Sequence, residues 1–188
     1  MDEEVLVRQA LAGDRDSFAA LVEKFKAPVY NLAYRMMGNS IDAEDVAQDA
    51  FLRAYTQLAT YQPDRKFGTW LLSIAAHLCI DRLRRKRPIS LDSLPFFDRP
   101  DEVSKGPETA ALDREKRDAI QDLLKSLPVK YRAPIVLRYW YDRSYAEIAT
   151  ILGLSESAVK TRLFRARELL ARELGRKKEQ DSVLSKSW

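Results

Sequence analysis

Apolar residues recur at intervals of three and four along most of the chain, which is the spacing of amphipathic α-helices. Glycine and proline divide this pattern into separate helices, because they fall between the apolar stripes. The sequence therefore predicts an all-α fold. The expected helices cover about residues 5–12, 16–26, 28–37, 40–58, 70–87, 108–126, 128–141, 145–152 and 156–174.

Residues 144–174 carry the pattern of a helix-turn-helix. Ser144 and Glu147 have the spacing of a capping box, which begins a short helix over residues 145–152. Gly153 suits the left-handed position that ends this helix, and Ser155 can cap a longer second helix. In a helix-turn-helix the second helix enters the major groove of DNA.

The second helix of this motif has an apolar face and a basic face. At about 100° per residue, the face expected to point at the core holds Val159, Leu163, Ala166, Leu170 and Leu174. The opposite face holds Ser157, Lys160, Thr161, Phe164, Arg165 and Arg172. Cations reach phosphates and guanine edges, while threonine and aromatic side chains contact the thymine methyl group. A solvated charged face is the alternative, but the capped first helix, the glycine turn and the outward Phe164 favour DNA binding.

Residues 39–58 predict an acidic helix. Ser40 can cap it, and its outer face holds Asp42, Asp45, Asp49 and Arg53, flanked by Gln48 and Leu52. The carboxylates spread over about two turns without companion ligands, which argues against a site for a hard metal ion. A solvated face and a surface for docking a protein partner both fit the pattern.

A loop and a basic helix follow. The loop, residues 59–69, is expected to display Tyr61, Arg65, Lys66 and Phe67, and aromatic side chains among cations suit single-stranded bases. The outer face of the next helix holds Trp70, Ser73, His77, Asp81 and Arg84. Five of the six residues from Arg82 to Arg87 are basic, and such a run repels itself unless an anion such as nucleic-acid phosphate offsets it.

Residues 89–107 predict a linker rich in proline. Leu94, Phe96 and Phe97 are unusual in an inert spacer, since exposed aromatic side chains tend to pack on something. We expect this linker to dock in a groove of a partner or of the protein itself.

Composition narrows the remaining classes of function. The 188 residues are 46% hydrophobic and 32% charged with a net charge of +4, so clustered cations matter more than the total. One cysteine excludes an internal disulfide and a cysteine-based zinc site. Without an apolar run of membrane-spanning length or a signal peptide, we expect a cytoplasmic protein without membrane insertion. One histidine, one cysteine and scattered acids form no catalytic constellation, so no enzyme, metal site or cofactor is expected.

Together, these segments resemble the sigma factors of the sigma-70 family, in the extracytoplasmic-function (ECF) group. The stretches that carry the resemblance are DAEDVAQDAFLRAY, FGTWLLSIAAHLCIDRLRRKR, LPVKYRAPIVLRY and SYAEIATILGLSESAVKTRLFRAREL. The resemblance implies two small helical domains joined by an extended linker. Sigma domain two would cover residues 1–88, the linker 89–107, sigma domain four 108–175 and a flexible tail 176–188.

The resemblance also implies what each segment does in promoter-specific transcription initiation, in a stress or envelope response. Residues docking on the clamp helices of the largest RNA polymerase subunit would be Asp45, Gln48, Asp49, Leu52 and Arg53. Residues that open and bind the minus-10 element would be Tyr61, Lys66, Phe67, Trp70, Ser73, His77, Arg82, Arg84, Arg85 and Arg87. Residues that bind the minus-35 element would be Ser157, Lys160, Thr161, Phe164 and Arg165. The polymerase flap and an anti-sigma factor, commonly membrane-anchored, are further implied partners, and the linker would run toward the active-site cleft.

Two positions depart from the family pattern, and one rival hypothesis stays open. His77 stands where relatives often carry Asn, and Ser157 and Ala158 replace a common Gly-Thr pair. The rival is a free-standing helix-turn-helix regulator that binds duplex DNA as a dimer, which leaves the acidic helix, the aromatic loop and the linker unexplained.

Overall fold

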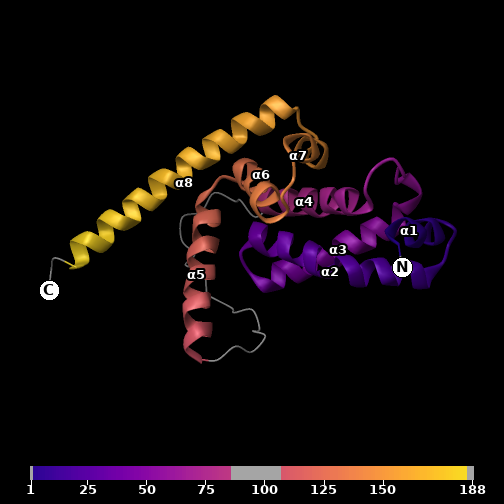
Figure 1. Ribbon diagram of the computed structural model, residues 1–188, viewed down its shortest axis with the longest axis horizontal. Helices are drawn as coiled ribbons and strands as arrows, with labels where there is room; N and C mark the ends of the chain where they lie inside the picture. Colours follow the sequence, from indigo (N-terminus) through magenta and orange to yellow (C-terminus); the bar gives the residue numbers. More distant parts are fainter. Residues whose placement is uncertain (1, 86–106, 186–188) are drawn as a thin grey trace.

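The computed structural model describes residues 2–85 and 107–185 (Figure 1). Within these ranges the chain forms α-helices and one short 3-10 helix, which confirms the all-α fold class. The elements are α1 (Glu3–Leu11), α2 (Arg15–Met37), α3 (Ser40–Thr56), η1 (Leu58–Thr60), α4 (Phe67–Arg85), α5 (Pro107–Ser126), α6 (Val129–Trp140), α7 (Tyr145–Leu152) and α8 (Glu156–Ser185). Arg87 lies outside the described residues, and so does the predicted linker, residues 89–107, except for its last residue.

The N-terminal half, α1 to α4, is organised around α2. This helix packs against α1, α3 and α4, and buries Leu21, Leu32 and Met36 completely. The facing sides of α3 and α4 carry alanines at 0% exposure, which let the backbones approach closely: Ala43, Ala50, Ala54, Ala75 and Ala76. This core holds the outer faces of α3 and α4 in fixed positions.

One long helix replaces two predicted ones in this half. A break was expected at Pro28, but α2 continues through it from Arg15 to Met37. Proline removes one backbone hydrogen bond inside a helix. Leu21 and Val29, on either side of it, are both fully buried, and their burial offsets that loss.

Helix starts differ slightly from the sequence prediction. The N-cap of α3 is Asn39 rather than Ser40, because the Asn39 side chain accepts a hydrogen bond from the Asp42 amide at 2.8 Å. Helix α4 begins at Phe67 instead of Trp70, so the predicted loop ends earlier. An added Cβ at Gly68 would lie 2.7 Å from the Phe25 ring, so glycine permits the close approach of α4 to α2 there.

The C-terminal half consists of α5 to α8. Helix α6 buries a continuous run from Arg132 to Leu137, against which α7 and α8 pack. Helix α8 leads away from α6 and α7 toward the C-terminus (Figure 1). It continues to Ser185, whereas a flexible tail was predicted from residue 176.

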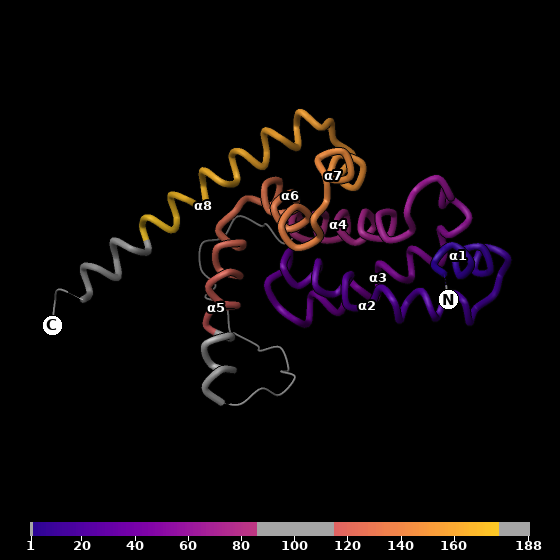
Figure 2. The backbone as a smooth tube through the Cα atoms, viewed as in Figure 1, coloured from indigo at the N-terminus to yellow at the C-terminus, as the bar shows by residue number. Residues whose placement is uncertain are grey.

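The two halves pack directly on each other. Helix α4 contacts α6 and α7, and α2 contacts α5 and α6. In the backbone trace, α4 lies beside α6 and α7 (Figure 2). The described residues therefore form a closed arrangement of both halves, although the sequence suggested two tethered domains.

Candidate nucleic-acid and polymerase interfaces

The predicted helix-turn-helix is present in α7 and α8. The Ser144 side chain accepts from the Glu147 amide at 3.2 Å, and the Glu147 carboxylate accepts from the Ser144 amide at 2.9 Å. Gly153 is left-handed with φ of 62°, as expected for the residue that ends the first helix. The Ser155 hydroxyl accepts from the Ala158 amide at 3.2 Å and caps α8. Local sequence signals therefore determine where α7 begins and ends and where α8 begins.

We expect Ser144→Ala to destabilise the C-terminal half by about 1 kcal/mol, because it removes the acceptor of the capping box. The midpoint of urea unfolding measures this change. The hydrogen bond from the Ser144 amide to the Glu147 carboxylate holds the pKa of Glu147 below its ordinary value. The stability that this second bond of the capping box contributes is therefore present above the ordinary pKa of a glutamate and is lost as the pH falls through the lowered pKa.

Ser126→Ala is the matched control, since that hydroxyl donates to a carbonyl of its own helix and caps nothing. We expect it to change the stability by less than about 0.5 kcal/mol. Equal midpoints for the two variants would contradict the role assigned to Ser144.

The outward face of α8 matches the predicted DNA-binding face. On the inward side Val159, Leu163 and Ala166 are buried, whereas Leu174, also predicted to face the core, is 45% exposed. The exposed side chains are Ser157, Lys160, Thr161, Phe164 and Arg165. Phe164 is 53% exposed, which is a high value for a large apolar ring. Arg165 pairs with Glu168 at 2.9 Å, and this exposed pair is weak enough to exchange for a phosphate or base.

The predicted minus-10 residues fall into an accessible group and a buried group. Lys66, His77, Arg84 and Arg85 are exposed, and Trp70, Ser73 and Arg82 are partly exposed. Tyr61 and Phe67 are only 9% and 2% exposed, so the expectation that the loop displays both rings is wrong.

Burial of Tyr61 and Phe67 has a clear physical cause. The Phe67 ring packs against Phe25, Tyr61 and Trp70, with ring centroids 5.5–5.6 Å apart. The Tyr61 hydroxyl donates to the Arg65 carbonyl and so closes the loop on itself. These aromatic contacts stabilise the start of α4 in place of offering a stacking platform for bases. Among the predicted aromatic contacts, Trp70 remains the most accessible.

The predicted docking face lies on the outer side of α3. Asp45, Gln48, Asp49, Leu52 and Arg53 are all exposed, and Leu52 reaches 63%. An exposed leucine surrounded by charges is suited to a protein partner that covers it. Asp45 pairs with Arg82 of α4 at 3.0 Å, so this acidic face is joined directly to the basic end of α4.

The carboxylates of α3 do not converge on a metal. Asp42 bonds to Asn39 at the helix cap, and Asp45 pairs with Arg82. Within residues 2–85 and 107–185, no cluster of three or more potential metal ligands was found. Cys79 is fully buried, and burial raises the pKa of its thiol to about 12, so it is protonated at neutral pH.

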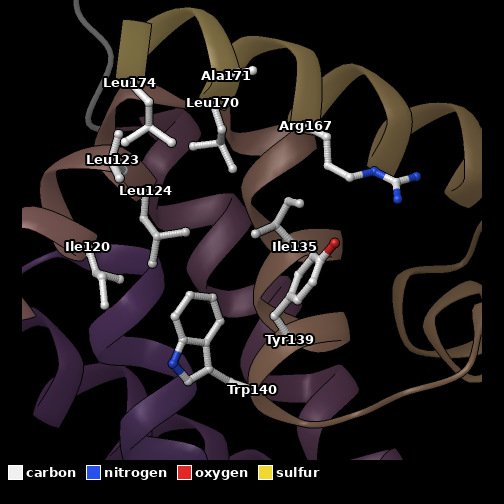
Figure 3. A pocket seen from close by; sticks show the side chains of 10 residues that line it. All are labelled: Ile120, Leu123, Leu124, Ile135, Tyr139, Trp140, Arg167, Leu170, Ala171 and Leu174. Atoms are coloured by element: carbon white, nitrogen blue, oxygen red, sulfur yellow. The ribbon is translucent and has the colours of Figure 1, made fainter. Parts of the chain in front are cut away.

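An apolar groove lies between α5, α6 and α8 (Figure 3). Its volume is about 430 Å³, and Ile120, Tyr139 and Leu174 on its walls are 43%, 60% and 45% exposed. Arg167 stands at one side as the single charged lining residue. The sequence alone does not predict this groove, because it forms only where three helices meet.

The polar contacts between the two halves are likewise not predicted from the sequence. Arg132 is 7% exposed and donates to the Met36 carbonyl of α2 at 2.5 Å. Burial lowers the pKa of its guanidinium. The sequence places Arg132 directly before the apolar run of residues 133–137, and an arginine buried with that run requires buried acceptors.

Known proteins share these features. The model of sigma-70 region 2 matches residues 21–89, and that of sigma-70 region 4 matches residues 117–170. The first match covers most of α2 together with α3 and α4, and the second covers α7 and the first half of α8, so the class of protein is that of the sigma factors.

Relatives and solved structures define the class further. The ECF RNA polymerase sigma factor SigW of Bacillus subtilis is 40% identical over 176 residues, covering 89% of this chain and 94% of the relative. The RNA polymerase sigma-H factor of Pseudomonas aeruginosa is 31% identical, covering 92% and 93%. The structure of CnrH in complex with the cytosolic domain of CnrY is similar with a TM-score of 0.68 and 29% identity, covering 92% of this chain and 97% of CnrH.

The chain therefore belongs to the sigma-70 family of RNA polymerase sigma factors, in the ECF group. Proteins of this family direct RNA polymerase to promoters and act as transcription initiation factors. Among the described helices, none is both long and apolar enough to cross a membrane.

Proposed function

We propose that the chain binds core RNA polymerase through α3 and recognises two promoter elements through different halves. The observation that carries this proposal is the exposed face of α8, where Lys160, Thr161, Phe164 and Arg165 project from a capped helix-turn-helix. A helix presented in this way can enter the major groove, with cations on phosphates or guanine and the ring on a thymine methyl group. We assign this face, including Ser157, to the minus-35 element.

The minus-10 element is assigned to α4 and the loop before it. Lys66, Arg84 and Arg85 are exposed cations that can hold the phosphate backbone. Trp70, Ser73 and His77 follow one another at helical spacing on the same outer face, where they can contact unpaired bases. Tyr61 and Phe67 support this face from below, since both rings contact Trp70.

Docking on the clamp helices of polymerase is assigned to the outer face of α3. The exposed Leu52 supplies apolar contact area, and Asp45 and Asp49 select a basic partner surface. The Asp45–Arg82 pair links this surface to the DNA-binding end of α4, so polymerase docking and DNA binding can influence each other there.

The apolar groove of the C-terminal half is assigned to the polymerase flap. Its lining is apolar apart from Arg167, so it suits an apolar helix of a partner. An anti-sigma factor, anchored in a membrane, would act by covering such surfaces in a stress or envelope response. The similar protein CnrH was solved in complex with the cytosolic domain of CnrY, which supports a protein partner that binds this chain.

Arg165→Ala tests the assignment of α8. If Arg165 contacts a base edge, the variant should weaken binding to a minus-35 element by about 1–3 kcal/mol and relax the preference at one base pair. The affinity and the base preference are both measured by letting promoter variants compete for polymerase that carries the wild-type or the variant chain. Arg8→Ala, at an exposed arginine of α1 that lies on none of the proposed surfaces, is the matched control. An unchanged base preference in Arg165→Ala would refute the assignment.

A further inference from the structure

A separate cavity lies where α2, α4 and the C-terminal end of α6 meet. Its volume is about 350 Å³, within the range of about 300–1,000 Å³ that is typical of small-molecule sites. Trp140 borders both this cavity and the apolar groove (Figure 3). The other lining residues belong to none of the surfaces assigned above to DNA or polymerase.

The lining of this cavity combines apolar side chains with two cations. Phe25, Pro28 and Leu72 supply apolar walls, and Arg35 and Arg143 supply positive charge. None of the described residues that line the cavity carries a carboxylate. The potential inside is therefore positive, and salt screens charges that are partly buried less than charges on an open surface.

Arg35 is a partly buried cation without an acidic partner. Its guanidinium lies over the Trp140 ring, 5.0 Å from the centroid, and donates to the Asn31 carbonyl at 3.2 Å. The ionisable side chains that act on it are Tyr34 and Tyr141, and burial lowers the pKa of the guanidinium. Arginine is still charged at neutral pH, so this cation stands at the cavity wall without a counter-ion among the described residues.

Arg143 contributes the second cation and an unused donor. Its guanidinium pairs with Glu147 at 3.0 Å through Nη1. Its Nε is buried and has no hydrogen-bond partner in the part of the chain that the structure describes. A buried donor without an acceptor costs free energy, and an oxygen atom of a bound molecule would recover that loss.

Tyr141 supplies no negative charge to the cavity. Its hydroxyl donates to the Pro28 carbonyl at 2.5 Å, and burial raises the pKa of the phenol, so the side chain is neutral at physiological pH. The positive charge of the two arginines is therefore not balanced from within the lining, apart from the Glu147 partner of Arg143.

We propose that this cavity binds a small organic anion with one aromatic ring and one carboxylate or phosphate group. Arg35 and the Arg143 Nε hold the anionic group through charge-assisted hydrogen bonds, and Phe25 and Leu72 contact the ring. A neutral apolar molecule leaves the cations uncompensated, and an inorganic anion leaves the apolar walls in contact with water. The inference goes beyond the proposed function and does not depend on it.

Isothermal titration calorimetry of the full chain with four probes tests the chemistry of the site. Benzoate and phenyl phosphate carry both features, benzamide lacks the charge, and inorganic phosphate lacks the ring. We expect saturable binding of benzoate, phenyl phosphate or both at one site. Benzamide and inorganic phosphate should bind at least about tenfold more weakly, since each loses one of the two sets of contacts. The aromatic anion that binds more tightly identifies the class of head group.

Two pairs of variants locate the binding. Arg35→Gln should weaken the binding of the aromatic anion at least about tenfold, whereas Lys26→Gln, at an exposed cation of α2 outside the cavity, should leave it unchanged. Ala27 lines the cavity and is exposed, so a longer side chain there leaves the core intact. Ala27→Glu places a carboxylate at the cavity and should weaken binding at least about threefold relative to the neutral Ala27→Gln.

The Ala27 pair decides the outcome even if circular dichroism shows that Arg35→Gln loses its helices. The inference would be overturned if neither aromatic anion bound saturably to the wild-type chain, or if benzamide bound as tightly as benzoate. Binding of equal strength in Ala27→Glu and Ala27→Gln would likewise place the anion elsewhere and reject this site.

Discussion

Phe67→Ala should destabilise the N-terminal half by about 3–5 kcal/mol, the largest stability change expected from a single substitution here. The ring is 2% exposed and contacts Phe25, Tyr61 and Trp70 at the start of α4. Its loss leaves a cavity at the point where the loop, α2 and α4 meet. Small domains are stable by only about 5–15 kcal/mol, so the variant should be close to unfolding at 37 °C. The midpoint of chemical unfolding measures the change.

The neighbouring residue provides the control for Phe67. Lys66 is exposed and assigned to DNA, so Lys66→Ala should reduce promoter binding while its unfolding midpoint stays within about 0.5 kcal/mol of the wild type. A Phe67→Ala protein of normal stability that fails to open promoters would show that the ring contacts bases after all.

Asp49→Lys should weaken the binding of core polymerase by at least about tenfold, which corresponds to about 1.4 kcal/mol. The variant places a cation where the account requires attraction to a basic surface, and like charges facing each other across an interface cost more than the lost pair alone. Fluorescence anisotropy of the labelled chain with polymerase measures the affinity. Binding of isolated minus-35 DNA, which belongs to α8, should not change.

Glu44→Lys is the matched control for Asp49→Lys. Glu44 is exposed on the same helix, but at about 100° per residue it lies about 140° away from Asp49. The charge change is the same, so a general effect of net charge would weaken both variants equally. Equal losses would contradict a docking face centred on Asp49 and Leu52.

Local signals made the helix-turn-helix predictable. Ser144, Glu147 and Gly153 act within a few residues of one another, so their spacing alone determines the helix ends and the turn. The exposed face of α8 followed from helical periodicity once those ends were known. The resemblance to sigma factors supplied the purpose of these surfaces, which no spacing could provide.

Features set by tertiary packing were not predictable in the same way. Tyr61 and Phe67 stand beside cations in a segment with proline and glycine, and only the position of Phe25 on α2 shows that their rings are enclosed. The course of α2 through Pro28 likewise depends on what its flanking residues bury. The contact of Arg132 with Met36 joins residues 96 positions apart, beyond the reach of any local pattern.

The most direct test of the account is promoter-dependent initiation by core RNA polymerase reconstituted with the purified chain on a library of promoter sequences. We predict discrete transcripts from templates that share two elements, nearly lost with Asp49→Lys and reduced with Arg165→Ala according to the minus-35 sequence. No initiation on any template, together with tight binding of a dimer to duplex DNA, would contradict the account and favour a free-standing helix-turn-helix regulator.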